Sequence, residues 1–593
     1  MPSPVELINK AIFFHQQGNL GEAEAIYKKV LHVHAKNFDA LHMLGIINAQ
    51  RGLFDEAEKL VRKALSVDSK TAQCFHNYGT ILAKLQRFEE AVSNYNKAIK
   101  LAPNHAPIYA DLGIALNKLK RYEEEIAAYD KILSLEPNFT GVEGARLYAK
   151  MHLCDWNNFD TECSHLISSV RNGKGNTLPF QILAIPSTSK DQLRCAKQHI
   201  ANNFLLSEKP IWQGERYNHK RIRVAYLSAD FRQHAGAYLM AGLFEQHDRS
   251  RFEIIGVSFG VDDRSEIRKR LVVAFDEFYD VRTKSDQQVA KLLHDLQIDI
   301  AIDRSGYTQG YRFGIFACRP APIQVSYLAY PSTMGTQFID YIIADKVVAP
   351  FEHQQFFTEK IVHLPDCYQV NDSKRKIAEV TPTRQAAGLP EHRFVFCCFN
   401  NNYKITPRVF DCWMRILKQV EDSVLWLFED NATAGSNLRK EAMARGVNSE
   451  RLIFAKRMPL AEHLARHRIA DLFLDTLPYN AHTTASDALW AGLPVLTCLG
   501  ETFAGRVAAS LLNAIRLPEL ITTTLEAYER MAIDLATHPE KLAIIKSKLA
   551  SNRLTTPLFD TKLFTKHIEA AYIEMYERHK AGFALDHIII PKS

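Results

Sequence analysis

The sequence predicts an α-helical repeat solenoid followed by an α/β region made of two Rossmann-like lobes. Three observations lead to this prediction. Small residues recur every 34 positions in the first quarter of the chain, short β-branched runs alternate with helical segments from about residue 219, and a polar segment at about 370–390 divides the second region. A chain of 593 residues is also too long for one core, so several structural units are expected.

Composition and charge narrow the class of protein. Hydrophobic residues make up 47% and charged residues 24%, as in ordinary soluble globular proteins. The net charge of +6 is small for this length and predicts no nucleic-acid partner. The ten cysteines include no Cys-x-x-Cys pair, which argues against a disulfide scaffold or structural zinc and favours a reducing compartment. Residues 1–6 lack signal-peptide features and no apolar run is long enough to span a membrane, so we expect a cytoplasmic protein.

A repeat of 34 residues occupies about 5–138. Each unit reads as a helix, a short turn, a second helix and a stop. Small residues let the paired helices approach closely, and an aromatic residue at each turn packs between neighbours. The period resembles that of tetratricopeptide repeats, in about four units, with a degenerate helical cap after them. Residues that keep the step include Gly45, Gly79 and Gly113, Gly18 and Gly52, Ala23, Ala57 and Ala91, Ala64 and Ala98, and Pro103 and Pro137.

The repeat array is expected to present a concave surface that binds a peptide or a partner protein. The alternative is a structural or dimerisation arm. In some proteins with such repeats, the concave face carries a ladder of asparagines. The corresponding positions here are Met43, Asn77 and Asp111, so that ladder is mostly missing.

The second region is predicted to hold two parallel sheets with crossover helices. A helical cap and connector (139–218) leads into a first lobe (219–369), an interlobe connector (370–390), a second lobe (391–580) and a tail (581–593). Ligands of such open sheets bind beyond the carboxyl ends of the strands, so the loops after the strands should carry the chemistry. The expected strands are 222–227, 252–257, 298–302, 323–328 and 341–344 in the first lobe, and 394–399, 424–428, 452–454, 472–474 and 495–497 in the second.

The loop at 475–492 is a candidate phosphate site. A buried strand leads into a turn that opens a helix with His482, Thr483 and Thr484. Free N–H groups and the helix dipole favour an anion there, and Asp487, one turn on, is placed to bind a ribose hydroxyl. In the alternative interpretation, Thr483 is an ordinary N-cap and Asp487 a favourable acid near the helix start.

Two further strand-end loops carry candidate groups. Lys404, in the loop 398–407, could neutralise the charge that builds on a departing diphosphate; the alternative is a solvated surface lysine. Asp230 and His234 follow the first strand of the first lobe and form the pair expected of a general base. A histidine on a loop is often structural, and that alternative also stays open.

Together with the segments 306–312, 318–324 and 500–510, these loops closely resemble the protein O-GlcNAc transferase family, in a bacterial-type form. That family joins tetratricopeptide repeats to a GT-B catalytic domain of two Rossmann-like lobes facing a cleft. The resemblance covers nearly the whole chain. It implies a glycosyltransferase with a nucleotide-sugar donor, acceptor proteins or peptides held through the repeat groove, and a homodimer as a further expectation.

The resemblance also assigns roles to residues. His234 and Asp230 match the active-site histidine and its neighbouring carboxylate, and Lys404 matches the lysine that stabilises the leaving diphosphate. Three departures stand beside these matches: Asn401 replaces a glutamine and Leu460 a lysine of the animal members, and Ala329 replaces a glycine beside the sugar. The expected donor-binding residues are Asn401, His463, Arg466, His482, Thr483, Thr484 and Asp487, and Arg312 is expected on the acceptor side.

The mechanism implied is an inverting transfer of N-acetylglucosamine from UDP-GlcNAc to a Ser or Thr hydroxyl. Lys404 and the helix that starts at His482 would stabilise the leaving group, and His234, Asp230 or a donor phosphate oxygen would accept the hydroxyl proton. No Asp-x-Asp stands at a strand end, so neither a cofactor nor a metal is required. The alternatives are fucose from GDP-fucose, glucose from UDP-glucose, a nucleotide-sugar epimerase, and a repeat scaffold without catalytic activity.

Overall fold

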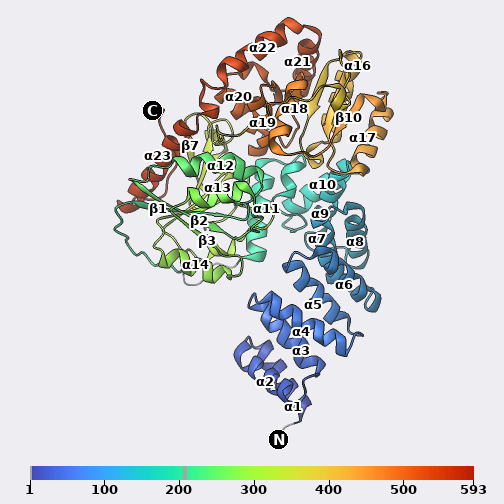
Figure 1. Ribbon diagram of the computed structural model, residues 1–593, viewed down its shortest axis with the longest axis vertical. Helices are drawn as coiled ribbons and strands as arrows, with labels where there is room; N and C mark the ends of the chain where they lie inside the picture. Colours follow the sequence, from blue (N-terminus) through green and yellow to red (C-terminus); the bar gives the residue numbers. More distant parts are fainter. Residues whose placement is uncertain (1–2, 205–209, 593) are drawn as a thin grey trace. The chain divides into compact units, whose positions relative to one another are not determined.

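The computed structural model describes residues 3–204 and 210–592 (Figure 1). The chain divides into two compact units, one formed by Met1–Lys150 with Thr283–Ser285 and the other by Met151–Arg282 with Asp286–Ser593. The first unit is all helical and the second is built on two parallel sheets, which confirms the predicted fold class.

The first unit is a series of antiparallel helix pairs. Three of the recurring glycines, Gly45, Gly79 and Gly113, sit where a helix of one pair meets its partner, whereas Gly18 and Gly52 lie in turns at positive φ. A Cβ atom at Gly79 would lie 2.6 Å from Cε1 of Tyr95, and one at Gly113 would lie 2.5 Å from Cε1 of Tyr129. The 34-residue glycine step is therefore a packing requirement. The helices are α1 (Pro4–Gln16), α2 (Leu20–Val33), α3 (Phe38–Gln50), α4 (Phe54–Val67), α5 (Ala72–Lys84), α6 (Phe88–Leu101), α7 (Ala106–Lys118) and α8 (Tyr122–Leu135).

Two of the three positions compared with the asparagine ladder, Asn77 and Asp111, bond to histidines of the preceding repeat. Nε2 of His42 lies 3.0 Å from the Asn77 amide, and Nε2 of His76 lies 2.8 Å from Oδ2 of Asp111. These side chains connect α3 to α5 and α5 to α7. Some of their hydrogen-bonding groups are therefore already used within the solenoid.

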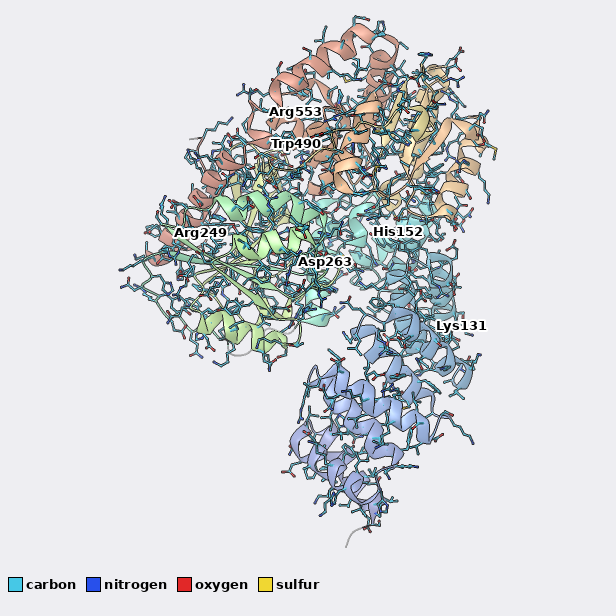
Figure 2. The ribbon with its side chains drawn as sticks, viewed as in Figure 1. Lys131, His152, Arg249, Asp263, Trp490 and Arg553 are labelled. Carbon is cyan, nitrogen blue, oxygen red and sulfur yellow. The ribbon has the colours of Figure 1, made fainter. Side chains whose placement is uncertain are left out.

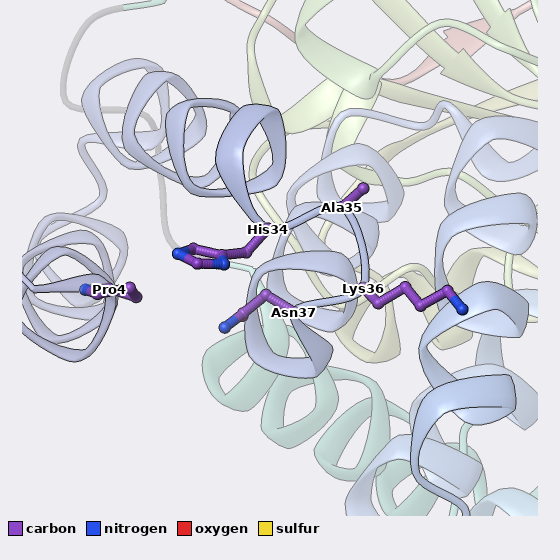
Figure 3. Close-up of a pocket in the computed structure, with 5 residues that line it drawn as sticks. All are labelled: Pro4, His34, Ala35, Lys36 and Asn37. Carbon is purple, nitrogen blue, oxygen red and sulfur yellow. The ribbon is translucent and has the colours of Figure 1, made fainter.

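A cavity of about 500 Å³ lies near the N-terminal end of this unit (Figure 3). It is formed by the turn between α2 and α3 together with the start of α1. None of its lining side chains is buried and none is a carboxylate, so it is a surface hollow without a preorganised polar group. The lining residues are Pro4, His34, Ala35, Lys36 and Asn37.

The first lobe of the second unit holds an eight-stranded parallel sheet in the order β14-β7-β6-β5-β4-β1-β2-β3. Its central strands are buried along their length, as parallel strands covered on both faces are. The strands are β1 (Ile222–Ser228), β2 (Phe252–Ser258), β3 (Glu277–Asp280), β4 (Ile300–Asp303), β5 (Ile323–Ser326), β6 (Tyr341–Asp345), β7 (Lys360–Leu364) and β14 (Ile588–Ile589).

The second lobe holds a six-stranded parallel sheet in the order β10-β9-β8-β11-β12-β13. Its hydrophobic interior includes Trp413, which is fully buried. The strands are β8 (Val395–Cys398), β9 (Val424–Phe428), β10 (Leu452–Ala455), β11 (Leu472–Leu474), β12 (Val495–Cys498) and β13 (Ile521–Thr522).

Crossover helices join the strands of both sheets, and three helices precede them. In chain order they are α9 (Val142–His152), α10 (Phe159–Arg171), α11 (Ser189–Asn203), α12 (Ala235–Gln246), α13 (Glu266–Ala274), α14 (Asp286–Asp295), α15 (Gly314–Ala317), α16 (Pro407–Gln419), α17 (Ala432–Ala444), α18 (Leu460–Arg466), α19 (Thr483–Ala491), α20 (Val507–Ala514), α21 (Leu525–Thr537), α22 (Pro539–Asn552) and α23 (Thr561–Lys580).

The C-terminal segment corrects one part of the predicted organisation. Residues up to 580 were expected in the second lobe, yet α23 packs into the core of the first lobe and β14 extends the first sheet beside β7. The hydroxyl of Tyr572 lies 2.8 Å from that of Tyr226 on β1, and Glu569 accepts from His247 at 2.9 Å. The apolar face of α23 fits this core, so the chain returns to the first lobe after completing the second.

Four strands were not predicted: β3, β7, β13 and β14. β3 is partly exposed at the sheet edge and lacks a continuous apolar run, and β13 and β14 are two residues each.

All ten cysteines are free thiols, and nine of them are buried. Among the residues described, no helix combines the length and the apolar character needed to cross a membrane.

Candidate active site

The predicted site residues of the second unit lie either in loops at the carboxyl ends of parallel strands or in the helices α18 and α19. The loop after β1 leads to His234 at the start of α12, and the loop after β11 leads to His482 at the start of α19. Helices α12 and α19 contact each other, so the two lobes meet where these helices run. Chemistry at this junction can use groups from both sheets.

Asp475 organises the loop that opens α19. Its carboxylate is 3% exposed and accepts three hydrogen bonds, from the backbone N–H of Thr476 at 2.7 Å, that of Ala481 at 2.6 Å and the hydroxyl of Thr497 at 2.6 Å. Its carbonyl also accepts from the hydroxyl of Tyr528 at 3.0 Å. Burial raises the pKa of Asp475 to about 6, while these bonds and the charge on Lys404 favour the ionised form. One carboxylate therefore holds both ends of the turn.

The start of α19 has the form of an anion site. His482 occupies the N-cap position but makes no side-chain cap bond; its Nε2 instead lies 3.0 Å from the carbonyl of Ala504. The first N–H groups of a helix have no intrahelical partner, and here no cap bond takes their place. The side chains of Thr483 and Thr484 are half-buried at this end. The alternative in which Thr483 is an ordinary N-cap is wrong, because Thr483 is inside the helix.

Lys404 points into this loop and is not a surface residue. It is 8% exposed, donates to the carbonyl of Asn480 at 2.8 Å and lies 3.9 Å from the centre of the Tyr479 ring. Burial lowers the pKa of Lys404 to about 7, and Asp475 opposes that shift. The ammonium is therefore near half protonation at neutral pH. An anion placed beside it would favour the charged form.

A second pair of contacts joins the loops after β8 and β11. Asn400 donates to the hydroxyl of Thr476 at 2.8 Å, and its carbonyl oxygen accepts from the hydroxyl of Thr484. The predicted donor residue Asn401 follows directly and is exposed. Thr484 is thereby fixed relative to the β8 loop, although its hydroxyl is already used in that contact.

His463 and Arg466 gather around Phe399 at the end of β8. The ring of Phe399 lies 5.5 Å from that of His463, and the guanidinium carbon of Arg466 lies 4.5 Å from the Phe399 ring. Nη1 of Arg466 donates to the carbonyl of Lys456 at 2.7 Å, whereas Nε and Nη2 are buried without a hydrogen-bond partner among the described residues. Burial lowers the pKa of His463 to about 2, so its ring is neutral. A neutral ring and unpaired donors suit a planar polar ligand such as a nucleobase.

Asp487 is 5% exposed and pairs with Arg375 of the interlobe connector. Burial raises the pKa of Asp487 and the arginine opposes that shift. Helix α19 has no acid in its first turn, so the alternative in which Asp487 is a favourable first-turn acid is wrong. Arg375 was not predicted from the sequence, because its partner lies 112 residues away.

The predicted pair in the first lobe, Asp230 and His234, is held more loosely than the residues of the second-lobe loops. Oδ2 of Asp230 lies 3.6 Å from Nδ1 of His234, and Oδ1 accepts from Arg232 at 3.2 Å. The side chain of His234 is 43% exposed, and its Nδ1 accepts from the N–H of Gly236 at 3.2 Å. With Nδ1 accepting, the neutral ring carries its proton on Nε2. Partial burial lowers the pKa of His234, Asp230 raises it, and Arg232 and Arg304 lower it further.

Two other residues complete the first-lobe side. Arg304, which follows β4, is 3% exposed, and its Nε and Nη1 have no hydrogen-bond partner in the described part of the chain. Arg312, predicted on the acceptor side, donates to Asp286 at 2.7 Å and to the carbonyl of Val281 at 3.1 Å. Its guanidinium is therefore anchored by protein groups at the end of β3.

The sequence analysis missed three residues on which the site depends: Asp475, Arg375 and Arg304. Asp475 could have been found, because an acid directly after a buried strand stands at the edge where ligands bind. No sequence pattern indicates a role for Arg375 or Arg304. Within residues 3–204 and 210–592, no cluster of three or more His, Cys, Asp or Glu side chains is arranged to hold a metal ion.

A model of glycosyl transferase family 41 matches residues 153–381 and 375–568, which include both lobes and all these loops. The chain belongs to glycosyl transferase family 41. A model of the tetratricopeptide repeat protein 21 C-terminal ARM domain matches residues 11–145 of this family 41 chain, over the helical repeats.

The names of two curated relatives are consistent with this family. The family 41 chain is 41% identical over 369 residues to the Arabidopsis thaliana probable UDP-N-acetylglucosamine--peptide N-acetylglucosaminyltransferase SEC, a match that covers 61% of this chain and 38% of that protein. It is 28% identical over 562 residues to a Caenorhabditis elegans UDP-N-acetylglucosamine--peptide N-acetylglucosaminyltransferase, covering 74% and 49%. The chain thus spans about half or less of the length of these curated relatives.

A solved structure matches along the whole chain. A mutant of the Thermobaculum terrenum O-GlcNAc transferase is 26% identical, with a TM-score of 0.58, and the match covers 98% of this chain and 100% of that one. The order of repeats and lobes is therefore shared from end to end.

Proposed function

We propose that this family 41 chain transfers N-acetylglucosamine from UDP-GlcNAc to Ser and Thr hydroxyls of proteins, with inversion at the anomeric carbon. The observation that carries the proposal is the loop around Lys404, where a buried ammonium bonds to a turn that leads into an uncapped helix start. Positive charge and free N–H groups gathered at one point suit a leaving diphosphate. The 41% identity with the plant SEC protein supports UDP-GlcNAc as the donor.

The chemical step needs little covalent help from the protein. The acceptor oxygen forms a bond to the anomeric carbon as the bond to the diphosphate oxygen breaks, and the bonding pair leaves with UDP. Lys404 and the N–H groups of α19 stabilise the charge that appears on UDP. The hydroxyl proton must leave at the same time.

The proton is more readily taken by Asp230 or by a donor phosphate oxygen than by His234. Nδ1 of His234 accepts a bond from Gly236, so Nε2 of the neutral ring is a donor. In this geometry the imidazole can orient the acceptor hydroxyl without removing its proton. Asp230, 3.6 Å from the ring, stays available as a carboxylate acceptor.

The nucleotide would occupy the groups that gather at the second lobe. His463 and Arg466 suit the uracil ring, the hydroxyl of Thr483 and the backbone N–H groups of Thr483 and Thr484 suit the diphosphate, and Asp487 suits the ribose. Acceptor proteins would bind through the repeats, with Arg312 on the acceptor side of the first lobe. A homodimer and a cytoplasmic location remain predictions.

The test is transfer by the purified full chain. UDP-GlcNAc, UDP-glucose and GDP-fucose are supplied in turn with an unfractionated lysate as acceptor, and released nucleotide is measured together with the mass of modified peptides. We expect N-acetylhexosamine on Ser and Thr from UDP-GlcNAc alone. Lys404→Ala should lower turnover by roughly 10²-fold or more, because it removes one preorganised charge-stabilising donor.

The control is Lys562→Ala, since Lys562 is an exposed lysine of α23. It should leave turnover unchanged. Transfer from GDP-fucose alone would reassign the sugar, and no transfer from any of the donors would overturn the proposal.

A further inference from the structure

The ion pair between Arg375 and Asp487 is the strongest feature that the proposed chemistry does not yet explain. Arg375 is 6% exposed and donates through Nη1 to Oδ1 of Asp487. Its Nη2 lies 3.3 Å from the hydroxyl of Ser486 and 3.4 Å from Oδ1 of Asn371. The guanidinium is therefore fixed by helix α19 and by its own segment of the connector.

The indole of Trp490, on the same helix α19, supports Arg375. Figure 2 labels Trp490 beside Arg553, a second arginine near this ring. The guanidinium carbon of Arg375 lies 5.9 Å from the Trp490 ring, and that of Arg553 lies 6.0 Å from it. The indole N–H also donates to the carbonyl of Arg375 at 3.1 Å. The position of Arg375 is thus set by contacts on both its backbone and its side chain.

The pair is only half satisfied. Asp487 accepts through Oδ1, and within the described residues its Oδ2 takes no hydrogen bond. Nε of Arg375 is likewise buried without a partner in the part of the chain that the structure describes. A carboxylate offers two oxygens with several lone pairs, and Oδ2 of Asp487, unlike Nε of Arg375, is not among the enclosed atoms that lack a partner in the described part of the chain. Oδ2 is therefore open to a ligand that brings hydroxyl donors.

The location of Asp487 makes its neutralisation necessary. It lies four residues beyond Thr483, about one helical turn from the free N–H groups of α19. An unpaired carboxylate so close to the phosphate-binding turn would repel a diphosphate. The arginine cancels that charge while keeping Asp487 ionised, so that it can still accept from hydroxyl groups.

The connector that carries Arg375 is itself anchored to the first lobe. Asp372 is 1% exposed and accepts from Arg270 of α13 at 2.6 Å, and Arg270 also donates to Glu245 of α12 at 2.6 Å. Asn371 bonds to Ser486 of α19. Arg375 is therefore held from both lobes.

We propose that Arg375 is a positioning residue that presents the free Oδ2 of Asp487 to the ribose diol of the donor nucleotide. The proposal rests on the proposed function and adds a chemical requirement to it: the ligand at this point must carry free vicinal hydroxyls. Arg375 touches Asp487 and not the sugar, so its effect appears only through that carboxylate.

The experiment compares two ligands on several variants by isothermal titration calorimetry with the full chain. UDP and 2′,3′-dideoxy-UDP differ only in the diol. The wild-type chain should bind UDP about tenfold or more tightly than the dideoxy compound, because the diol bonds to a charged acceptor. In Arg375→Met and in Asp487→Asn that ratio should fall toward one.

Two further variants separate positioning from a general structural role. Arg375→Lys keeps the charge but not the two-pronged geometry, and should give an intermediate ratio even where Arg375→Met fails to fold. Lys376→Ala removes an exposed charge one residue after Arg375 without touching Asp487, and should keep the wild-type ratio. An equal loss of affinity for both ligands in the Arg375 variants would overturn the proposal. Failure of the wild-type chain to bind UDP at all would instead overturn the proposed function on which it rests.

Discussion

The two loops at the interlobe junction differ in how completely their polar groups are paired. In the second lobe, Asp475 is almost fully buried, accepts three hydrogen bonds and fixes the turn before α19. In the first lobe, the side chain of His234 is 43% exposed and lies 3.6 Å from its carboxylate neighbour Asp230. One side of the site is preorganised, and the other is left open.

The difference follows from what each side would bind. A nucleotide diphosphate has the same shape in every turnover, so groups fixed in advance stabilise its charge without reorganisation during the reaction. Acceptor proteins differ from one another, and an exposed side chain can adjust to them. Substitutions in the turn before α19 should therefore change donor affinity, while those in the loop after β1 should change turnover and leave donor affinity nearly unchanged.

The largest effect on donor affinity is expected from Asp475→Asn. An amide carries no charge, so the two backbone N–H bonds from the turn lose their ionised acceptor and the bond to Thr497 of β12 must reverse, and UDP should bind roughly tenfold or more weakly. Calorimetric titration with UDP measures this. Thr497→Val, which removes one donor to the same carboxylate, is the matched milder variant. An unchanged UDP affinity in Asp475→Asn would mean that the turn before α19 does not depend on the hydrogen bonds to Asp475.

The next effect is a dependence of UDP affinity on pH. Burial lowers the pKa of Lys404 to about 7, and a bound diphosphate would raise it, so binding above pH 7 takes up a proton. Affinity should then be level just below pH 7 and fall by up to about tenfold per pH unit between 7 and 9. Titrations in two buffers of different ionisation enthalpy count the protons taken up.

Lys404→Arg is the matched control, because arginine stays protonated over this range. Its UDP affinity should hardly vary between pH 7 and 9. The same steep fall in that variant would assign the proton to another group.

The smallest effect on donor affinity is expected from His234→Asn. Asparagine is a good N-cap residue, so the start of α12 is preserved. UDP affinity should stay within about twofold, while turnover should fall by roughly tenfold or more, because the acceptor hydroxyl loses its orienting group. Affinity from titration and turnover from initial rates separate the two. An equal loss of UDP affinity and of turnover in His234→Asn would contradict the proposed difference between the loops after β1 and β11.

The sequence was most informative where local packing or topology dictates residue type. The glycine step of the repeats marks contacts such as that between Gly79 and Tyr95, and the parallel strands follow from buried apolar runs. The burial of Lys404 could not be read from the sequence, since it depends on loops after two different strands. Arg375 meets Asp487 only because the connector folds back onto α19.

The return of α23 and β14 to the first lobe has a consequence for biosynthesis. Phe564, Ile568 and Met575 belong to the core of the first lobe, yet they are translated after every strand of the second lobe. Domains generally fold in the order in which they leave the ribosome. Part of the apolar core of the first lobe therefore stays uncovered until the second lobe and then α23 have left the ribosome. The second lobe can therefore reach its native state first, and a chain that stops between α22 and α23 would have a complete donor side and an unfinished first lobe.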